Sequence, residues 1–486
     1  MSDFNRNRPY WIVNIGLEVH VQLKTKTKMF CSCAADSQAP PNTNICPVCT
    51  GQPGVLPVKN EEAVLLGIRA GLALNCKIEK FSVFERKNYF YPDSPKAYQI
   101  SQCELPLATG GFVEVNDRKV RLTRAHLEED AGKLLHFIGS EPVDGSLVDL
   151  NRCGTPLLEI VSEPDIDSPQ LAFDYLKTLR RIMRYAGVSD CDMEEGSLRC
   201  DCNISIRRSE DEPLGVKAEI KNMNSFKELK DASTYEIERQ KKLVDGGGQV
   251  IQETRLWNSS KGKTFSMRSK EEAADYRYFP DPDLKPVYVS AGMLKKEKEA
   301  LPSLPLEMKK KFMSRGLSEY QADILTDEKV LSDYFDEVIA GVTPDGQEEA
   351  ANIVISYLLA EFDQSALSLE ELKKIVPPAH ICELVKLRKE GKINKQVLKT
   401  LFPQMIKEKK SPRELVKDVN IVSDESTIIK LVEAAIEANA SSWEDYKSGK
   451  EKASGRIIGY VMQQSKGATD PATVKKILDR IKDGNR

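Results

Sequence analysis

The chain has 486 residues, of which 40% are hydrophobic and 30% charged, and its net charge is −3 at neutral pH. This composition is typical of a globular protein of two to four domains, at roughly 150 residues per domain. It excludes a protein that grips nucleic acid over its whole surface, and charges interrupt every apolar run before the roughly 20 residues that a membrane span needs.

The segment 11–24, with sequence WIVNIGLEVHVQLK, alternates apolar and polar residues. A period of two predicts a β-strand with one buried face. Glu18 and His20 then project side by side from the polar face, roughly 7 Å apart along the strand. A carboxylate beside an imidazole suits a divalent-metal site, although a solvated strand face would carry the same residues.

A cysteine cluster follows this strand, with the spacing C-x-C-x₁₂-C-x₂-C at Cys31, Cys33, Cys46 and Cys49. Four thiolates without a histidine are the closed ligand set of a structural zinc site, and reduced cysteines without metal are the alternative. The chain has 11 cysteines, an odd number, and the other seven are scattered. We therefore expect a reducing, cytoplasmic environment, which the absence of an apolar targeting segment in the first residues also favours.

The segment 85–102, with sequence ERKNYFYPDSPKAYQISQ, contains three tyrosines, one phenylalanine and three basic residues around a Pro-Asp turn. Aromatic and basic side chains together can stack on a base or line a binding pocket. A rigid connection between two strands would have the same composition. The segment is therefore a candidate pocket wall.

Two further segments place carboxylates near predicted strands. The segment 155–165 is an apolar strand interrupted by Glu159, and an unpaired carboxylate is costly to bury unless it binds a cation. The segment 126–133, with sequence HLEEDAGK, adds an acidic run. The pattern does not decide between Glu128 and Glu129.

The segment 199–207, with sequence RCDCNISIR, predicts another strand, with Asp201 on its polar face between Arg199 and Arg207. A carboxylate flanked by guanidinium groups suits an anionic ligand held with a metal. Hard oxygen ligands favour Mg²⁺, and a metal held this way suggests phosphoryl transfer from a nucleotide. The candidate ligands are Glu18, His20, one of Glu128 or Glu129, Glu159 and Asp201. The chain has neither a P-loop nor a Rossmann fingerprint, so an ATP site would be of another kind.

The pattern changes from strands to helices along the chain. We predict an α+β protein with a β-rich catalytic domain at 1–294, a helical domain at 295–410 and a small helical tail domain at 411–486. Serines followed by Glu three residues later, at Ser368, Ser411 and Ser441, predict helix starts with capping boxes. Pro412 and Pro471 fit first helical positions.

Several segments in order along the chain resemble the B subunits of the bacterial-type Asp/Glu-tRNA amidotransferases. They are IGLEVHVQLKTKTKMF, RKNYFYPDSPKAYQIS, HLEEDAGK, SLVDLNRCGTPLLEIVSEPDI, MEEGSLRCDCNIS, KNMNSF, DYRYFPDPD and, in the tail, ASGRIIGYVMQQSKGATDP. The resemblance covers nearly the whole chain, and several of its segments exceed eight residues.

This resemblance implies a cradle-like catalytic domain and a subunit of a heterotrimeric, glutamine-dependent ligase that acts in translation. An amidase-like A subunit would release ammonia from glutamine, and a small C subunit would complete the complex. The B subunit would use ATP and Mg²⁺ to phosphorylate the side-chain carboxylate of Glu on tRNA(Gln) or Asp on tRNA(Asn). Ammonia arriving through an internal channel would then displace phosphate. No amidase Ser-Ser-Lys signature is evident in this chain, so glutaminase activity is expected from the partner.

The resemblance also assigns roles to residues. It implies Mg²⁺ ligands at Glu18, His20, Glu129, Glu159 and Asp201, and so favours Glu129 over Glu128. Lys87 and Tyr89 are expected beside the ATP pocket, together with Arg199 from the strand pattern. The cysteine cluster is expected to hold structural zinc. The tail is expected to contact tRNA phosphates through Arg456 and Lys466.

Two alternatives differ from this interpretation. The archaeal relative, which serves only Glu-tRNA(Gln), carries a large inserted domain for which this chain has no room after DYRYFPDPD. A zinc-containing, tRNA-binding scaffold without catalysis would lose the acidic strand positions, yet all of them are present. The sequence does not decide whether Glu-tRNA(Gln), Asp-tRNA(Asn) or both are substrates.

Overall fold

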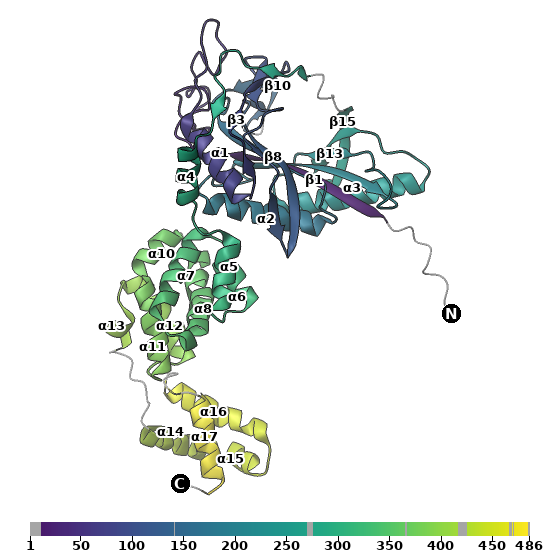
Figure 1. The fold of residues 1–486 in the computed structure, drawn as a ribbon. Helices are drawn as coiled ribbons and strands as arrows, with labels where there is room; N and C mark the ends of the chain where they lie inside the picture. The colour runs from purple at the N-terminus through teal and green to yellow at the C-terminus, as the bar shows by residue number, and fades with distance from the viewer. Residues whose placement is uncertain are drawn as a thin grey trace. The chain divides into compact units, whose positions relative to one another are not determined.

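The computed structural model describes residues 11–139, 141–269, 276–364, 367–416, 425–465, 469 and 471–484. The chain divides into two compact units, Met1–Leu304 and Pro305–Arg486. The first unit is β-rich and the second is helical (Figure 1). This confirms the predicted fold class. Among the described residues, no helix combines the length and the apolar character that crossing a membrane would require.

A ten-stranded sheet forms the centre of the first unit as far as it is described. Its order is β15 (Lys263–Ser269), β14 (Glu253–Asn258), β13 (Ala218–Lys221), β12 (Leu198–Arg207), β1 (Ile12–Gln22), β11 (Pro156–Ser162), β8 (Arg118–Glu129), β6 (Ala108–Thr109) and β2 (Lys77–Ile78), and β7 (Phe112–Val115) pairs with β8. All pairs are antiparallel except β13 with β14. The predicted strand at 11–24 is therefore a central strand of the sheet, between β11 and β12.

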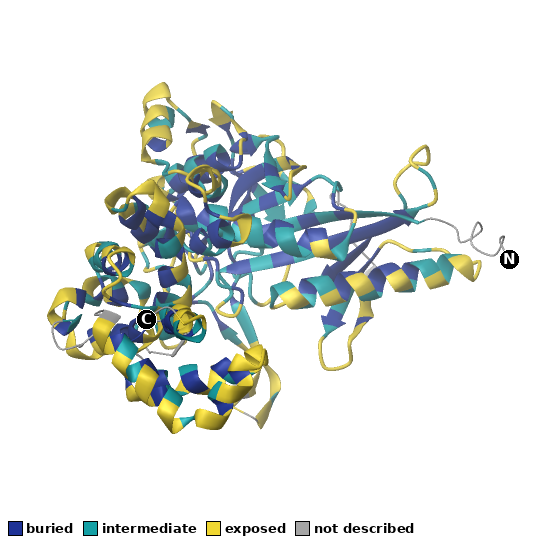
Figure 2. Ribbon diagram, turned by 90° about the horizontal axis from the view of Figure 1, so that it is seen from below, coloured by how far each residue is buried: buried dark blue, intermediate teal, exposed yellow. Residues whose placement is uncertain are grey.

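The apolar residues of β1, from Ile15 to Val21 in alternation, are fully buried in the core of this unit. Helices α1 (Glu61–Ala73), α2 (Pro169–Tyr185) and α3 (Phe226–Asp245) contribute to the same core. Ser168 caps α2 by accepting a hydrogen bond from Leu171 N, and Pro169 occupies the first turn. Most of the central sheet is buried or half-buried (Figure 2). The helices thus cover the apolar face, and the polar face of β1 is left for other groups.

Short strands complete the first unit. They are β3 (Phe81–Ser82), β4 (Glu85–Asn88), β5 (Tyr98–Ser101), β9 (Lys133–Ile138), β10 (Glu141–Asp149), β16 (Phe279–Pro280) and β17 (Val287–Tyr288). The aromatic segment at 85–102 forms the antiparallel pair β4–β5 and the turn that joins them. The predicted domain end at residue 294 falls inside α4 (Ala291–Ala300), which packs on α1 through an ion pair of 2.7 Å between Arg69 and Glu297.

The second unit is built from helices. They are α5 (Pro305–Ser314), α6 (Glu319–Leu325), α7 (Lys329–Gly341), η2 (Pro344–Gly346), α8 (Gln347–Ile353), η3 (Val354–Leu358), α9 (Leu359–Gln364), α10 (Leu369–Ile375), α11 (Pro378–Lys389), α12 (Lys395–Glu408), α13 (Pro412–Val416), α14 (Glu425–Ala438), α15 (Ala440–Lys447), η4 (Glu451–Ala453), α16 (Ser454–Gln464) and α17 (Pro471–Lys482). The helices α14 to α17 share a hydrophobic cluster of their own. The predicted division at residue 411 stays a prediction, and α13, just after it, packs on α11 and α12.

The predicted helix starts are confirmed in part. The capping box at Ser368 is present, and α13 and α17 begin at Pro412 and Pro471. The start at Ser441 was wrong, because this serine lies inside α15, which has Asn439 at its N-cap position.

Candidate functional site

Strand register brings the predicted polar residues of the sheet together. On one side of β1, His20 lies opposite Glu159 of β11, and on the other side Glu18 lies opposite Asp201 of β12. Glu159 in turn lies opposite His126 of β8. Directly opposed side chains on one face of a sheet are close neighbours. Glu18 and His20 therefore each belong to a row of polar side chains that runs across neighbouring strands.

A group of one imidazole and two carboxylates lies on this face. His20 Nε2 is 3.4 Å from both Glu128 Oε1 and Glu159 Oε2, and the ligand atoms of the three residues all lie within 4.8 Å of one another. His126 Nε2 is also 3.4 Å from Glu159 Oε2. Carboxylates and imidazole are suitable ligands for a divalent cation. These side chains could hold a metal ion.

Glu18 and Asp201 line the same cavity as His20, His126 and Glu159, and this cavity has a volume of about 230 Å³. The amide of Asn203 donates a hydrogen bond of 2.8 Å to Glu18 Oε1. Asp201 forms an ion pair with Lys221, whose Nζ is also 3.5 Å from Glu219. Four of the five predicted metal ligands thus face one cavity.

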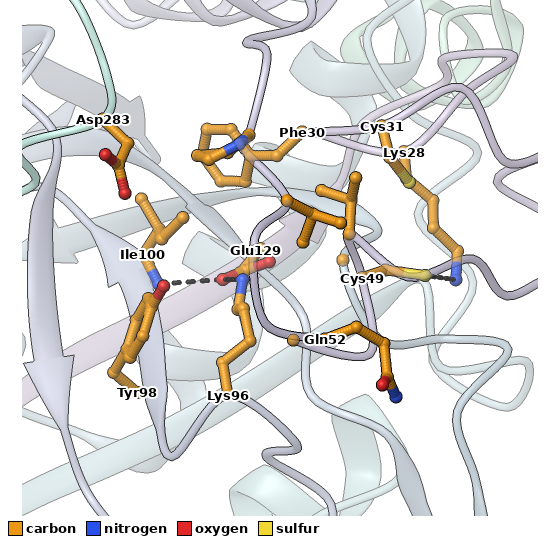
Figure 3. Close-up of a pocket in the computed structure, with 15 residues that line it drawn as sticks. Lys28, Phe30, Cys31, Cys49, Gln52, Lys96, Tyr98, Ile100, Glu129 and Asp283 are labelled. Carbon is orange, nitrogen blue, oxygen red and sulfur yellow. Dashed lines mark hydrogen bonds and ion pairs between the residues drawn. The ribbon is translucent and has the colours of Figure 1, made fainter.

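The fifth predicted ligand, Glu129, which the resemblance favoured, does not line this cavity. Glu128 and Glu129 are neighbours on β8, so their side chains leave opposite faces of the sheet. Glu129 accepts a hydrogen bond of 2.9 Å from Ile100 N and pairs with Lys96. It lines a second cavity of about 100 Å³ beside the cysteine cluster (Figure 3). The geometry favours Glu128 as the ligand next to His20.

The charges of His20, Glu128 and Glu159 depend on one another. Burial opposes charge on His20, but Glu159, with Glu128 and Asp201, raises the pKa of His20 to about 9. Burial also opposes ionisation of Glu159, but His126 and His20 hold its pKa well below the usual range. Burial and the charge of Glu159 raise the pKa of Glu128. A cation bound here would take the place of the protons that now relieve this repulsion.

Two basic residues line the cavity without a carboxylate partner among the described residues. The Lys87 ammonium lies 4.9 Å from the centroid of the Tyr276 ring, and Arg124 Nε donates a hydrogen bond of 3.4 Å to His126 Nδ1. Burial opposes the charge of Lys87, but Tyr278 and the carboxylates of Glu128 and Glu159 raise its pKa. Free cations beside a possible metal site can bind an anion such as a phosphate.

The other predicted cofactor contacts do not line this cavity. Arg199 pairs with the buried carboxylate of Asp130 at 2.6 Å. Tyr89 lines a small separate cavity beside Lys96, and burial raises the pKa of its hydroxyl to about 12.

The sequence interpretation missed several residues of the site. They are Arg124, Lys221, Glu219, Tyr276 and Tyr278, and His126 was noted only within the acidic run. Arg124, His126 and Glu128 alternate along β8 and share one face, but this end of the strand is buried on both faces and gives no alternating signal.

The four cysteines of the cluster do come together. The four sulfur atoms all lie within 4.8 Å of one another, and Cys46 N donates a hydrogen bond of 3.2 Å to Cys49 Sγ. A hydrogen bond from Cys31 and others from Cys46 lower the pKa of Cys49 to about 4, although burial opposes this. No cysteine of the chain forms a disulfide, and all of them belong to the described part. The cluster fits a tetrahedral metal such as zinc.

The predicted tRNA contacts lie in the second unit. Arg456 is exposed on α16, whereas Lys466 falls outside the described residues.

Comparison with known proteins shows the family of this chain. Residues 13–295 match the GatB/GatE catalytic domain, and residues 333–481 match the GatB domain. The chain is 48% identical over 479 residues to the B subunit of the aspartyl/glutamyl-tRNA(Asn/Gln) amidotransferase of Thermotoga petrophila, covering 97% of this chain and 98% of that protein. It is 47% identical over 474 residues to the B subunits of the same enzyme from Moorella thermoacetica and Persephonella marina, covering 96% of this chain and 98% of each relative. The chain therefore belongs to the family of GatB subunits of the aspartyl/glutamyl-tRNA amidotransferases.

Proposed function

We propose that this chain is the activating and amidating subunit of a tRNA-dependent amidotransferase. It would transfer the γ-phosphoryl group of ATP to the side-chain carboxylate of Glu on tRNA(Gln), of Asp on tRNA(Asn), or of both. Attack of ammonia on the acyl carbon would then expel phosphate and leave the amide, Gln-tRNA(Gln) or Asn-tRNA(Asn). A carboxylate is a poor acyl donor, and phosphorylation supplies the leaving group that it lacks.

One observation carries this proposal: a possible metal site and two cations without carboxylate partners among the described residues share one cavity. His20, Glu128 and Glu159 would hold Mg²⁺, and Glu18 and Asp201 add two further carboxylates to the cavity. The ion, when bound, would screen the repulsion between the phosphates and the attacking carboxylate. Lys87 and Arg124 would bind the phosphoryl oxygens and orient the group in line with that carboxylate.

The remaining parts of the reaction would come from partners. The relatives are themselves subunits of an amidotransferase, which implies that this chain also works with other subunits. We infer that these are a glutaminase A subunit, whose ammonia reaches the cavity through a channel, and a small C subunit in a heterotrimer. Arg456 and Lys466 of the tail would contact tRNA phosphates. Zinc held by the cysteine cluster would be structural, because four thiolates leave no open coordination position.

A direct test removes the need for the glutaminase. The chain is co-expressed with candidate A and C subunits and given ammonium chloride, ATP, Mg²⁺ and Glu-tRNA(Gln), without glutamine. We expect Gln-tRNA(Gln) from the wild type and none from Glu159→Gln. The matched control is Glu163→Gln, since Glu163 lies just beyond the end of β11, bonds to Thr123 and does not line the cavity.

tRNA binding separates catalysis from folding in this test. Glu159→Gln should bind tRNA as tightly as the wild type. Equal loss of binding and amidation would give Glu159 a folding role. Failure of the wild type with both Glu-tRNA(Gln) and Asp-tRNA(Asn), with tRNA still bound, would favour the tRNA-binding scaffold instead.

A further inference from the structure

A buried lysine contacts the cysteine cluster. The side chain of Lys28 has no exposed surface. Its ammonium lies 3.7 Å from Cys49 Sγ (Figure 3). It also lies 3.4 Å from the carbonyl oxygen of Leu150. Lys28 follows β1 in the chain, whereas Leu150 lies in the loop that leads into β11. The ammonium therefore sits between the cluster and a loop that enters the central sheet.

This ammonium has no carboxylate partner in the part of the chain that the structure describes. Lys96, which lines the same cavity, differs in this respect, because it pairs with Glu129 (Figure 3). A buried cation is strongly unfavourable unless an anion lies nearby. One carbonyl oxygen does not supply a full charge. The cysteine cluster is in direct contact with the ammonium and can supply one, whereas Glu129, which lines the same cavity, pairs with Lys96.

The charge of the cluster depends on whether it holds a metal. Zn²⁺ with four thiolates keeps a net negative charge, and Lys28 contacts one of those sulfur atoms. The amide hydrogen bond from Cys46 N to Cys49 Sγ stabilises a thiolate at the atom that Lys28 contacts. The burial of Lys28 against Cys49 Sγ therefore fits the negative charge of a metal-bound tetrathiolate.

We infer that Lys28 is the counter-cation of a zinc tetrathiolate at Cys31, Cys33, Cys46 and Cys49, and that it retards loss of the ion. This inference does not depend on the proposed enzymatic activity. Lys28 acts through the cluster and not on a substrate, so it is a positioning residue. Backbone bonds hold its position independently of its charge, because Lys28 N donates to Cys33 O at 2.9 Å and Met29 N to Gly154 O at 2.7 Å.

Zinc release from the purified full chain tests the inference. Zinc content is measured by elemental analysis, and release is followed with the chromogenic chelator 4-(2-pyridylazo)resorcinol. Lys28→Met removes the charge, and Lys28→Gln removes the charge but keeps a donor for Leu150 O. Lys28→Arg keeps the charge, and Lys26→Met is the matched control at an exposed neighbouring lysine.

We expect the wild type to contain one zinc per chain. Loss of a group that supports metal ligands typically costs 10–100-fold in metal affinity, so Lys28→Met and Lys28→Gln should release zinc roughly 10–100-fold faster. Lys28→Arg should stay close to the wild type, and Lys26→Met should match it.

Two results would overturn the inference. One is a wild-type chain that neither contains zinc nor takes it up. The other is a folded Lys28→Met or Lys28→Gln variant that releases zinc as slowly as the wild type. Circular dichroism checks folding, and if Lys28→Met does not fold, Lys28→Gln decides, since it removes the charge and keeps a hydrogen-bond donor.

Discussion

Glu128 and Glu129 are adjacent on β8, yet replacing each of them by glutamine should have a different effect on the stability of this protein. Glu129 is paired with Lys96, and the two side chains are only 4% and 9% exposed. Glu129→Gln leaves the ammonium of Lys96 buried without its partner, and breaking a buried pair costs about 3–5 kcal/mol. At about 2 °C per kcal/mol for a unit of this size, the melting temperature should fall by roughly 6–10 °C.

Glu128→Gln should leave the melting temperature unchanged or raise it in the absence of Mg²⁺. Burial and the charge of Glu159 raise the pKa of Glu128, so the folded protein already disfavours its ionised form. A neutral residue of the same shape removes that repulsion. It also removes a metal ligand, so the response to Mg²⁺ should be lost.

Differential scanning calorimetry with and without Mg²⁺ measures both effects. An ion at ten times its Kd should stabilise the wild type and Glu129→Gln by about 1.4 kcal/mol, or roughly 3 °C. Glu128→Gln should show no such shift. The assignment of Glu128 is refuted if Glu128→Gln keeps the full Mg²⁺ response while Glu129→Gln loses it.

Three further predictions concern other parts of the chain. Arg124→Gln should lower kcat/KM for ATP by roughly 10–1,000-fold in the ammonia-dependent assay, while Arg121→Gln, on the same strand but paired with Asp165 outside the cavity, should leave it unchanged. Arg456→Gln should weaken tRNA binding and reduce the slope of log K against log salt by about 0.7–0.9, as filter binding at several salt concentrations would show; an unchanged slope removes Arg456 from the phosphate contacts. Ser168→Ala removes the N-cap of α2 and should cost about 1 kcal/mol in urea unfolding, with amidation unchanged at 25 °C.

The sequence predicted the part of the site that follows a strict strand pattern. Alternation in β1 and β12 identified Glu18, His20 and Asp201, because one face of each strand is apolar and buried. The end of β8 has no such pattern, since it is buried on both faces from Ala125 to Glu129. Alternation therefore could not separate Glu128 from Glu129, and only the register with β11 does so.

Other features had no local signal. Lys28 follows a stretch of exposed and half-buried residues that includes other lysines. Its ammonium contacts the cysteine cluster and Leu150, which is distant in sequence. Arg199 follows the strand pattern, but its guanidinium turns to Asp130, which the pattern could not reveal. Helix caps at Ser368 and Ser441 look alike in sequence, and tertiary packing decides where each helix begins.

The central claim is that this chain activates a carboxylate, and trapping the activated species tests it most directly. The complex is given ATP, Mg²⁺ and Glu-tRNA(Gln) without any source of ammonia, and hydroxylamine is added to capture an acyl phosphate as a hydroxamate. The account predicts side-chain (γ) hydroxamate of glutamate and ADP in the wild type and in Glu163→Gln, and neither in Glu159→Gln. The α-hydroxamate that hydroxylamine forms from the aminoacyl ester is counted separately, and γ-hydroxamate that forms without ATP, or undiminished in Glu159→Gln, would contradict the account.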